Sequence, residues 1–151
     1  MKSNVCIFGS NSNLAKNFIK NYKNTFNFIG IHRETPKSKG DNNLIQVIES
    51  NLGGKYDQSS YKNLLEQLSG FAQGPFRTFI IFSWAGKPRQ IDKDICDTNN
   101  MINCNIIHNL INISKKFKPS QIIFISTAGA IYDQNSKEVF DETKMAKPSS
   151  A

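Results

Sequence analysis

The chain has 151 residues, of which 38% are hydrophobic and 21% charged, and this composition predicts one globular domain with a substantial core. It excludes a disordered tail and a membrane span. The formal net charge is +7, but it is spread evenly, since residues 1–75 carry nine basic and five acidic side chains and residues 76–151 carry ten and seven. We therefore expect a mildly basic, solvated surface and no nucleic-acid partner.

In chain order, short apolar runs alternate with helical patterns. The runs are mostly continuous, as in strands that are buried on both faces of a parallel sheet. The five predicted strands are Val5–Phe8, Phe26–Ile31, Leu44–Ile48, Thr78–Phe82 and Gln121–Ile125.

Three of the intervening segments carry apolar residues at intervals of three and four, which indicates amphipathic helices. The first stripe comprises Leu14, Ala15, Phe18, Ile19 and Tyr22. The second comprises Tyr61, Leu64, Leu65 and Leu68, and the third, from about 94 to 116, comprises Ile95, Ile102, Ile106, Leu110, Ile113 and Phe117. This alternation predicts a doubly wound α/β fold with a mainly parallel sheet and helices on both faces. No helical pattern follows the fifth run, so we expect one domain over 1–151, cut after its fifth strand.

The three cysteines, Cys6, Cys96 and Cys104, form no metal-type spacing with either histidine, His32 or His108. We therefore expect neither a metal site nor a disulfide framework. The N-terminal apolar run is too short for a signal peptide. Together these features predict a reduced, cytoplasmic protein that does not associate with a membrane.

The turn after the first strand is the first candidate site, because a strand, a turn and an amphipathic helix follow one another there. In that context Gly9 would permit a tight turn, and backbone N–H groups at the helix start would face the pyrophosphate of a dinucleotide. An ordinary turn with serine and asparagine as helix caps is the alternative. The residues concerned are Gly9, Ser10, Asn11, Ser12, Asn13 and Leu14.

The end of the second strand reads His32, Arg33, Glu34, where an acidic residue normally accepts the ribose 2′-hydroxyl of NAD. Arg33 could instead pair with the 2′-phosphate of NADP. Glu34 could still serve NAD, so both cofactors, NAD and NADP, stay open.

Further motifs follow in order along the chain. Ser83, Trp84 and Ala85 end the fourth strand, Asn103 lies within the long helix, and residues 122–132 run from an apolar strand into Ser126, Thr127 and Tyr132. Together with residues 148–151, this order resembles the extended short-chain dehydrogenase/reductases, and most of all the nucleotide-sugar epimerases and dehydratases of the UDP-glucose 4-epimerase type. The resemblance covers essentially the whole chain.

The resemblance implies a Rossmann-type NAD(P)-binding domain, with roles for particular residues. Asn51 and Leu52 would lie beside the adenine, and Ser83, Trp84 and Ala85 would line the cofactor, while Asn103 matches a helix asparagine of the family. Thr127, or else Ser126, would hydrogen-bond the reacting sugar oxygen, although two hydroxyls that cap a strand are an equal alternative. The departures from the family pattern are Ser12, His32, Asn51 and Ile106.

The family's catalytic pair is a tyrosine with a lysine four residues later, and the sequence contains no such pair. The positions four residues after the four tyrosines hold Phe26, Ser60, Leu65 and Ser136. We therefore expect these 151 residues to be the cofactor-binding part of a nucleotide-sugar enzyme, inactive as they stand. A non-catalytic nucleotide-sensing or scaffold module is the alternative, and a homodimer is an expected assembly because a sheet edge would be exposed.

Overall fold

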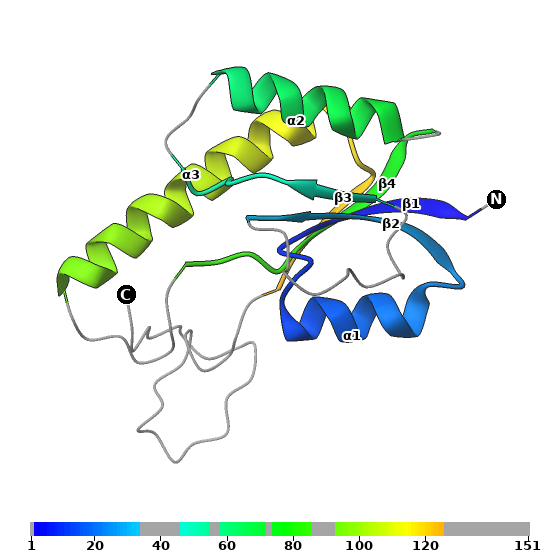
Figure 1. Ribbon diagram of the computed structural model, residues 1–151, viewed down its shortest axis with the longest axis horizontal. Coiled ribbons are helices and arrows are strands. Elements are labelled where there is room, and N and C mark those ends of the chain that lie inside the picture. Colours follow the sequence, from blue (N-terminus) through cyan, green and yellow to red (C-terminus); the bar gives the residue numbers. More distant parts are fainter. Residues whose placement is uncertain (1, 34–45, 55–57, 72–73, 86–92, 126–151) are drawn as a thin grey trace, which may run out of the picture.

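The computed structural model describes residues 2–33, 46–54, 58–71, 74–85 and 93–125. They form a single parallel sheet with the strand order β3-β2-β1-β4-β5. Figure 1 shows α1 on one face of this sheet and α2 and α3 on the other. The elements are β1 (Ser3–Phe8), α1 (Asn13–Tyr22), β2 (Phe26–His32), β3 (Gln46–Glu49), α2 (Gln58–Phe71), β4 (Phe76–Ile81), α3 (Lys93–Phe117) and β5 (Gln121–Phe124).

The prediction of a doubly wound parallel sheet covered on both faces is confirmed. The chain leaves β1 through α1 to build one half of the sheet, then crosses through α2 to β4 on the other side of β1. The strand order therefore reverses between β1 and β4. In open α/β sheets, ligands bind in the crevice outside the carboxyl ends of the strands at such a point.

The core has two layers because the central strands are apolar on both faces. In β1, Cys6 and Phe8 face the layer beneath α2 and α3, whereas Val5 and Ile7 face α1. The larger layer is rich in aromatic edge-to-face contacts, with the ring of Phe79 5.3 Å from that of Phe8 and 5.4 Å from that of Phe76. Burial on both faces accounts for the apolar runs of β1, β2 and β4. The edge strand β5 differs from the prediction, since Ile122 and Phe124 are exposed there.

The predicted helical stripes are correct in their centres and wrong at some of their ends. In α1, Ala15 and Ile19 are buried, but Leu14 is 57% and Tyr22 46% exposed. In α3, Ile95 is 47% exposed because the helix begins beyond the edge of the sheet (Figure 1). A helical period identifies a common face but does not say how far the neighbouring sheet extends beneath it.

The described residues lack the features of two other classes of protein. None of the helices described is long and apolar enough to cross a membrane. Within the same residues, no group of three or more His, Cys, Asp or Glu side chains could hold a metal ion. Cys6 is fully buried, and this burial raises the pKa of its thiol, whereas Cys104 is exposed on α3.

Candidate functional site

The turn between β1 and α1 depends on a glycine. Gly9 has φ 82°, in the left-handed region that glycine adopts without strain. Its N–H and that of Ser10 both donate to the carbonyl of Ile31, at 2.8 and 3.1 Å. A Cβ at Gly9 would lie 3.0 Å from the carbonyl carbon of Phe82 and from the backbone nitrogen of Ser83. The turn is therefore fitted closely between the ends of β2 and β4.

Ser12 begins helix α1 as its N-cap. Its hydroxyl accepts a hydrogen bond from the N–H of Ala15 at 3.2 Å, and its own N–H donates to the carbonyl of Gly9 at 3.0 Å. The side chain thus has the capping role that sequence reasoning gave as the alternative. The N–H groups of Asn13 and Leu14 donate no hydrogen bond to another of the described residues, and the first turn of α1 carries no acidic side chain. This helix start can therefore accept an anion.

Ser10 and His32 form a buried polar pair beneath the turn. The Ser10 hydroxyl lies 3.2 Å from His32 Nδ1, and the two residues are 3% and 7% exposed. Burial lowers the pKa of His32 below its ordinary value of 6.5, against the opposing charge of Glu49 and with a smaller contribution from Lys16. The imidazole is therefore neutral near pH 7. Its Nε2 is also buried and has no hydrogen-bond partner among the described residues.

His32 should make the stability of the protein depend on pH. A histidine with a lowered pKa in the folded state binds protons more readily when unfolded, so stability rises with pH. Above pH 6.5 the neutral His32 should make its full contribution to the free energy of unfolding. This contribution should be lost as the pH falls from 6.5 through the pKa of His32 in the folded state. Chemical denaturation at several pH values across this range gives the free energy of unfolding as a function of pH. That free energy should change less steeply with pH in His32→Gln than in the wild type. An equally steep slope in His32→Gln and in the exposed-site control His108→Gln would contradict the assignment.

The end of β4 is held by a side chain of α3. Asn103 Oδ1 accepts from the Ala85 N–H at 2.8 Å, and Asn103 Nδ2 donates to the Ala85 carbonyl at 3.1 Å. Next to it, the Trp84 indole N–H donates to the carbonyl of Ile125 at 3.2 Å. Asn103 therefore positions the backbone after β4 and does not itself line the cavity described below.

Removing the two Asn103–Ala85 hydrogen bonds should weaken both the fold and any ligand binding at the end of β4. Asn103→Ala leaves the Ala85 N–H and carbonyl without their partly buried partner, which costs about 1–3 kcal/mol in the free energy of unfolding. Denaturant titration measures this loss. Asn100→Ala, an exposed position on the same helix, is the matched control and should unfold like the wild type. Equal stability of the two variants would contradict a stabilising role of the Asn103–Ala85 hydrogen bonds.

Two more asparagines of α3 hold the loop after β3. Asn109 Nδ2 donates to the Leu52 carbonyl at 2.8 Å, and Asn105 Nδ2 donates to the Gly53 carbonyl at 3.2 Å. A Cβ at Gly53 would lie 2.6 Å from Cγ2 of Ile102, so the loop is packed directly on α3. Sequence reasoning missed both asparagines. Their recurrence on α3 was a visible signal, but their partners lie more than fifty residues away in the chain.

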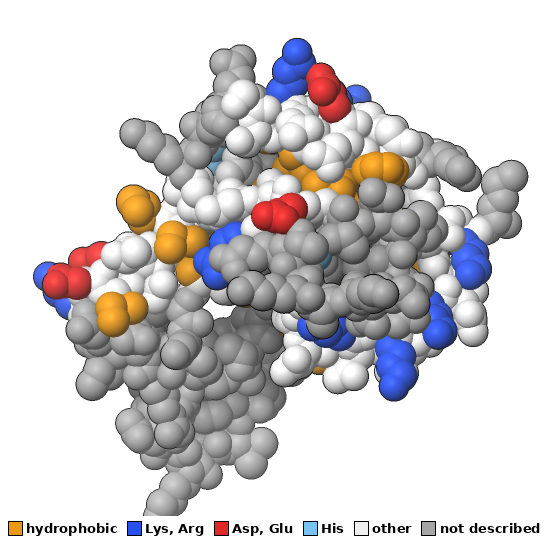
Figure 2. Space-filling view, viewed as in Figure 1, with side chains coloured by type: hydrophobic (Ala, Val, Ile, Leu, Met, Phe, Trp, Pro, Cys, Tyr) orange, Lys and Arg blue, Asp and Glu red, His pale blue; other side chains and the backbone are white. Residues whose placement is uncertain are grey.

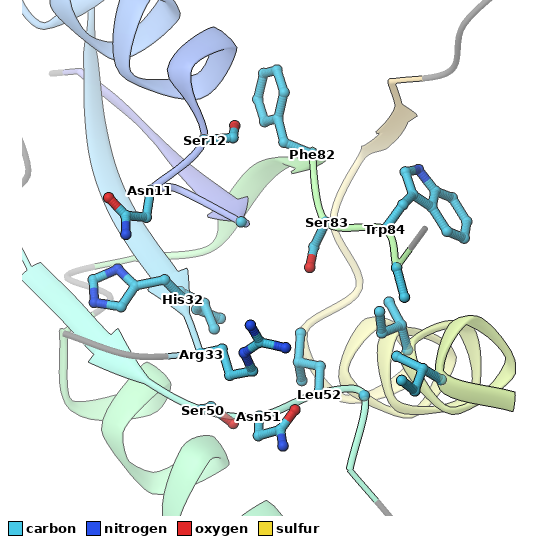
Figure 3. A pocket seen from close by; sticks show the side chains of 16 residues that line it. Asn11, Ser12, His32, Arg33, Ser50, Asn51, Leu52, Phe82, Ser83 and Trp84 are labelled. Carbon is cyan, nitrogen blue, oxygen red and sulfur yellow. The ribbon is translucent and has the colours of Figure 1, made fainter. Parts of the chain in front are cut away.

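These segments enclose a cavity of about 320 Å³ outside the carboxyl ends of β1 to β4 (Figure 3). The Arg33 side chain reaches into it toward Leu52 and Ser83, whereas the His32 ring and the Asn11 side chain point away from Ser83. A second cavity of about 410 Å³ adjoins it and shares Arg33 and residues 50–52. The first is lined by Gly9, Asn11, Ser12, Ile31, His32, Arg33, Ser50, Asn51, Leu52, Gly53, Phe82, Ser83, Trp84, Ala85, Ile102 and Ile106.

The structure brings most of the predicted binding residues together here. Among the predicted set, Ser10, Asn13, Leu14 and Asn103 do not line the cavity. Ser126 and Thr127, the predicted sugar-contacting hydroxyls, lie outside the described residues. The sequence placed Ile102 and Ile106 on the apolar stripe of the third helix, and Ile106 also among the departures from the family pattern, but it did not predict that the two form an apolar wall of the cavity.

This is a Rossmann fold. No family model and no curated protein matches the sequence. Among solved structures, the chain superposes on UDP-glucose 4-epimerase of Thermus thermophilus in complex with NAD, with a TM-score of 0.77 and 13% identity over 97% of this chain and 45% of that one. Another UDP-glucose 4-epimerase gives 0.74 and 14% over 98% and 42%. The uronate dehydrogenase of Agrobacterium tumefaciens gives 0.64 and 13% over 97% and 49%. The chain spans less than half the length of these proteins.

Proposed function

We propose that the chain is an NAD(P)-binding module. The observation that carries the proposal is the cavity at the switch point of the sheet, where the Gly9 turn and the open start of α1 meet the ends of β2 and β4. Its volume, about 320 Å³, is within the range of small-molecule and cofactor pockets. The NAD complex of the Thermus epimerase, which shares the fold, supports the same ligand class.

The chemistry of the cavity fits the three parts of a dinucleotide. The start of α1 offers N–H donors and a positive dipole end to the pyrophosphate. Leu52, Ile102 and Ile106 provide an apolar surface for the adenine. At the other end, the backbone of residues 83–85, held by Asn103, would line the nicotinamide half. When bound, the cofactor supplies a hydride acceptor, while the residues of this chain bind and orient it.

The residues around the adenosine ribose favour NADP. His32 stands where a carboxylate would accept the hydrogen bond of a free 2′-hydroxyl, and its ring points away from Ser83 and is hydrogen-bonded to Ser10 (Figure 3). Arg33 extends into the cavity, and a guanidinium is well suited to bidentate contacts with a phosphate. We expect Arg33→Ala to weaken NADP⁺ and NADPH by about tenfold or more, as for the loss of a charge-assisted hydrogen bond, and NAD⁺ and NADH much less.

Calorimetric titration of the wild type and Arg33→Ala with each of the four dinucleotides measures this difference. An equal loss of affinity for the phosphorylated and unphosphorylated pairs would remove Arg33 from phosphate recognition. Tighter binding of NAD⁺ than NADP⁺ by the wild type would do the same.

For the complete enzyme we propose a nucleotide-sugar epimerase or dehydratase that works by transient hydride transfer. The motif order and the overlap with two UDP-glucose 4-epimerases support this class. The 151 residues alone should not turn over, because no tyrosine is followed by a lysine four residues later and a missing general base costs about 10²–10⁴-fold. Incubation of the chain with NAD(P)⁺ and UDP-sugars should give no epimerised or dehydrated product. Turnover at the rate of an ordinary epimerase would overturn the proposal.

A second candidate is a nucleotide-sensing or scaffold module without catalysis, which would use the same cavity at the switch point of the sheet. Such a module would bind the dinucleotide and use the bound state to change its affinity for another molecule. The two candidates predict different amino-acid sequences beyond residue 151. A continuation with the Tyr–Lys pair supports the enzyme, and its absence supports the sensing module.

A further inference from the structure

The loop of residues 51–54, here called the dividing loop, separates the two cavities. Asn51 and Leu52 line both of them. Gly53 lines the first cavity but not the second, and Gly54 lines the second but not the first. Figure 3 shows Asn51 and Leu52 along one side of the first cavity, opposite the end of β4. The dividing loop is therefore a wall with about 320 Å³ of space on one side and about 410 Å³ on the other.

The second cavity is polar. Its lining consists mainly of amide and hydroxyl side chains, among them Ser60, Asn63 and Gln67 of α2. Figure 2 shows white, uncharged surface on this side of the molecule, toward the start of α2. A polar space of this size holds water, so a carbonyl of the dividing loop that turned toward it would be hydrated. The loop thus has room to move in this direction.

Helix α3 holds the dividing loop from the other side. The carbonyl of Leu52 accepts a hydrogen bond from the buried Asn109 at 2.8 Å, and the carbonyl of Gly53 accepts one from Asn105 at 3.2 Å. The two asparagines are four residues apart, so they lie on one side of the helix. Ile106, between them in sequence, is buried and lines the first cavity. One stretch of α3 therefore both fixes the loop backbone and supplies apolar surface to the site.

We propose that Asn105 and Asn109 are positioning residues for the adenosine half of the dinucleotide, an inference that rests on the proposed function. The apolar surface for the adenine comprises Leu52 from the dividing loop and Ile102 and Ile106 from α3. The hydrogen bonds from α3 to the loop fix the separation of these two parts. A binding site has to hold its contacting groups within about 0.5 Å of their working positions. Neither asparagine lines the first cavity, so each acts through the loop.

Asn103 provides the contrast, because it holds the other half of the site. It bonds both backbone groups of Ala85, and it lies about 9 Å along α3 from Asn109. The two halves of the cavity are thus held by separate side chains of one helix. A loss of affinity that is confined to one half of the ligand therefore distinguishes positioning from a general loss of stability.

Calorimetric titration of the 151-residue chain with a dinucleotide and with ADP tests the proposal. ADP shares the adenine, the ribose and the pyrophosphate with all four dinucleotides and lacks the nicotinamide half. Asn109→Ala should weaken both ligands by the same factor, about tenfold or more, as for the loss of one hydrogen bond. Asn103→Ala should weaken the dinucleotide but not ADP.

Asn112→Ala is the matched control. The Asn112 side chain lies on the same helix and makes no hydrogen bond to another of the described residues, so this variant should bind both ligands like the wild type. The Leu52 side chain is buried in the main core layer and keeps the dividing loop on the domain in Asn109→Ala. Circular dichroism verifies that each variant is folded.

Gly53→Ala displaces the dividing loop without removing an asparagine. The added Cβ would lie 2.6 Å from Cγ2 of Ile102, a branch of a helical side chain that has little freedom to rotate. The loop then has to move away from α3, toward the second cavity. Gly53→Ala should therefore weaken ADP and the dinucleotide together, as Asn109→Ala does.

The outcomes separate this inference from the proposed function. A wild type that binds none of the four dinucleotides would overturn the proposed function, and the positioning role with it. Three results would overturn the positioning role alone: binding of ADP by folded Asn109→Ala as tight as by the wild type, an equal loss of ADP affinity in Asn109→Ala and Asn103→Ala, or a wild type that binds a dinucleotide but not ADP.

Discussion

Gly9→Ala is expected to abolish dinucleotide binding and to destabilise the protein. Alanine at φ 82° is strained, which costs about 1–3 kcal/mol from the backbone conformation alone. Its Cβ would also lie 3.0 Å from backbone atoms of Phe82 and Ser83, which cannot rotate away like a side chain. Relief requires the turn to separate from the end of β4, and this moves the N–H groups at the start of α1. Calorimetric titration and denaturant unfolding measure the two effects.

Gly70→Ala is the matched control for this substitution. Gly70 lies in α2, where an added Cβ meets no atom within 4 Å. The variant should bind dinucleotides like the wild type and gain up to about 1 kcal/mol in stability, because alanine favours a helix more than glycine does. If Gly9→Ala bound and unfolded like Gly70→Ala, the turn would have no special role.

Phe79→Ala should cause the largest loss of stability in the chain. Phe79 lies in the interior strand β4, is fully buried, and has its ring within 5.4 Å of those of Phe8 and Phe76. Removing a buried phenylalanine ring costs about 3–5 kcal/mol, a large share of the roughly 5–15 kcal/mol that stabilises an ordinary domain. The midpoint of urea denaturation should fall accordingly, with an unchanged slope if unfolding remains two-state.

Phe79→Leu provides the comparison, since it retains most of the volume and should lose much less. A similar large loss in both variants would mean that the ring contacts, and not the filled volume, determine stability at this position. A small loss in Phe79→Ala would show that the aromatic cluster is not the centre of the core.

The fold could be predicted from the sequence because its signals are local. Each of the five strands contains a short, mostly continuous apolar run. The strand β1 shows the reason, since Cys6 and Phe8 face one core layer while Val5 and Ile7 face the other. The limits of burial could not be predicted in the same way. Leu14 and Tyr22 have the correct period for the buried face of α1, but they lie at the two ends of a ten-residue helix that contacts the sheet mainly through its centre.

The candidate site could be predicted only where topology alone determines position. Residues one or two positions after parallel strands meet at one edge, and this places Gly9, Arg33, Asn51 and Ser83 around one cavity. Contacts between distant segments could not be predicted. The Asn109–Leu52 bond joins residues 57 apart in the chain, and no local pattern indicates it.

His32 illustrates the same limit within the predicted site. Its position at the end of β2 could be predicted, but its burial and its bond with Ser10 could not. Burial lowers the pKa of His32 and keeps the imidazole neutral, and the bond with Ser10 holds one of its ring nitrogens beneath the turn. The identity of a residue at a strand end is therefore a weaker guide to ligand choice than its hydrogen-bond partner.

Calorimetric titration of the wild type and Gly9→Ala with NAD⁺, NADH, NADP⁺ and NADPH tests the central claim most directly. We predict saturable binding of one molecule per chain for at least one of the four dinucleotides, and loss of that binding in folded Gly9→Ala. No binding heat with any of the four, or binding that is unchanged in Gly9→Ala, would contradict the proposal that this cavity is a dinucleotide site.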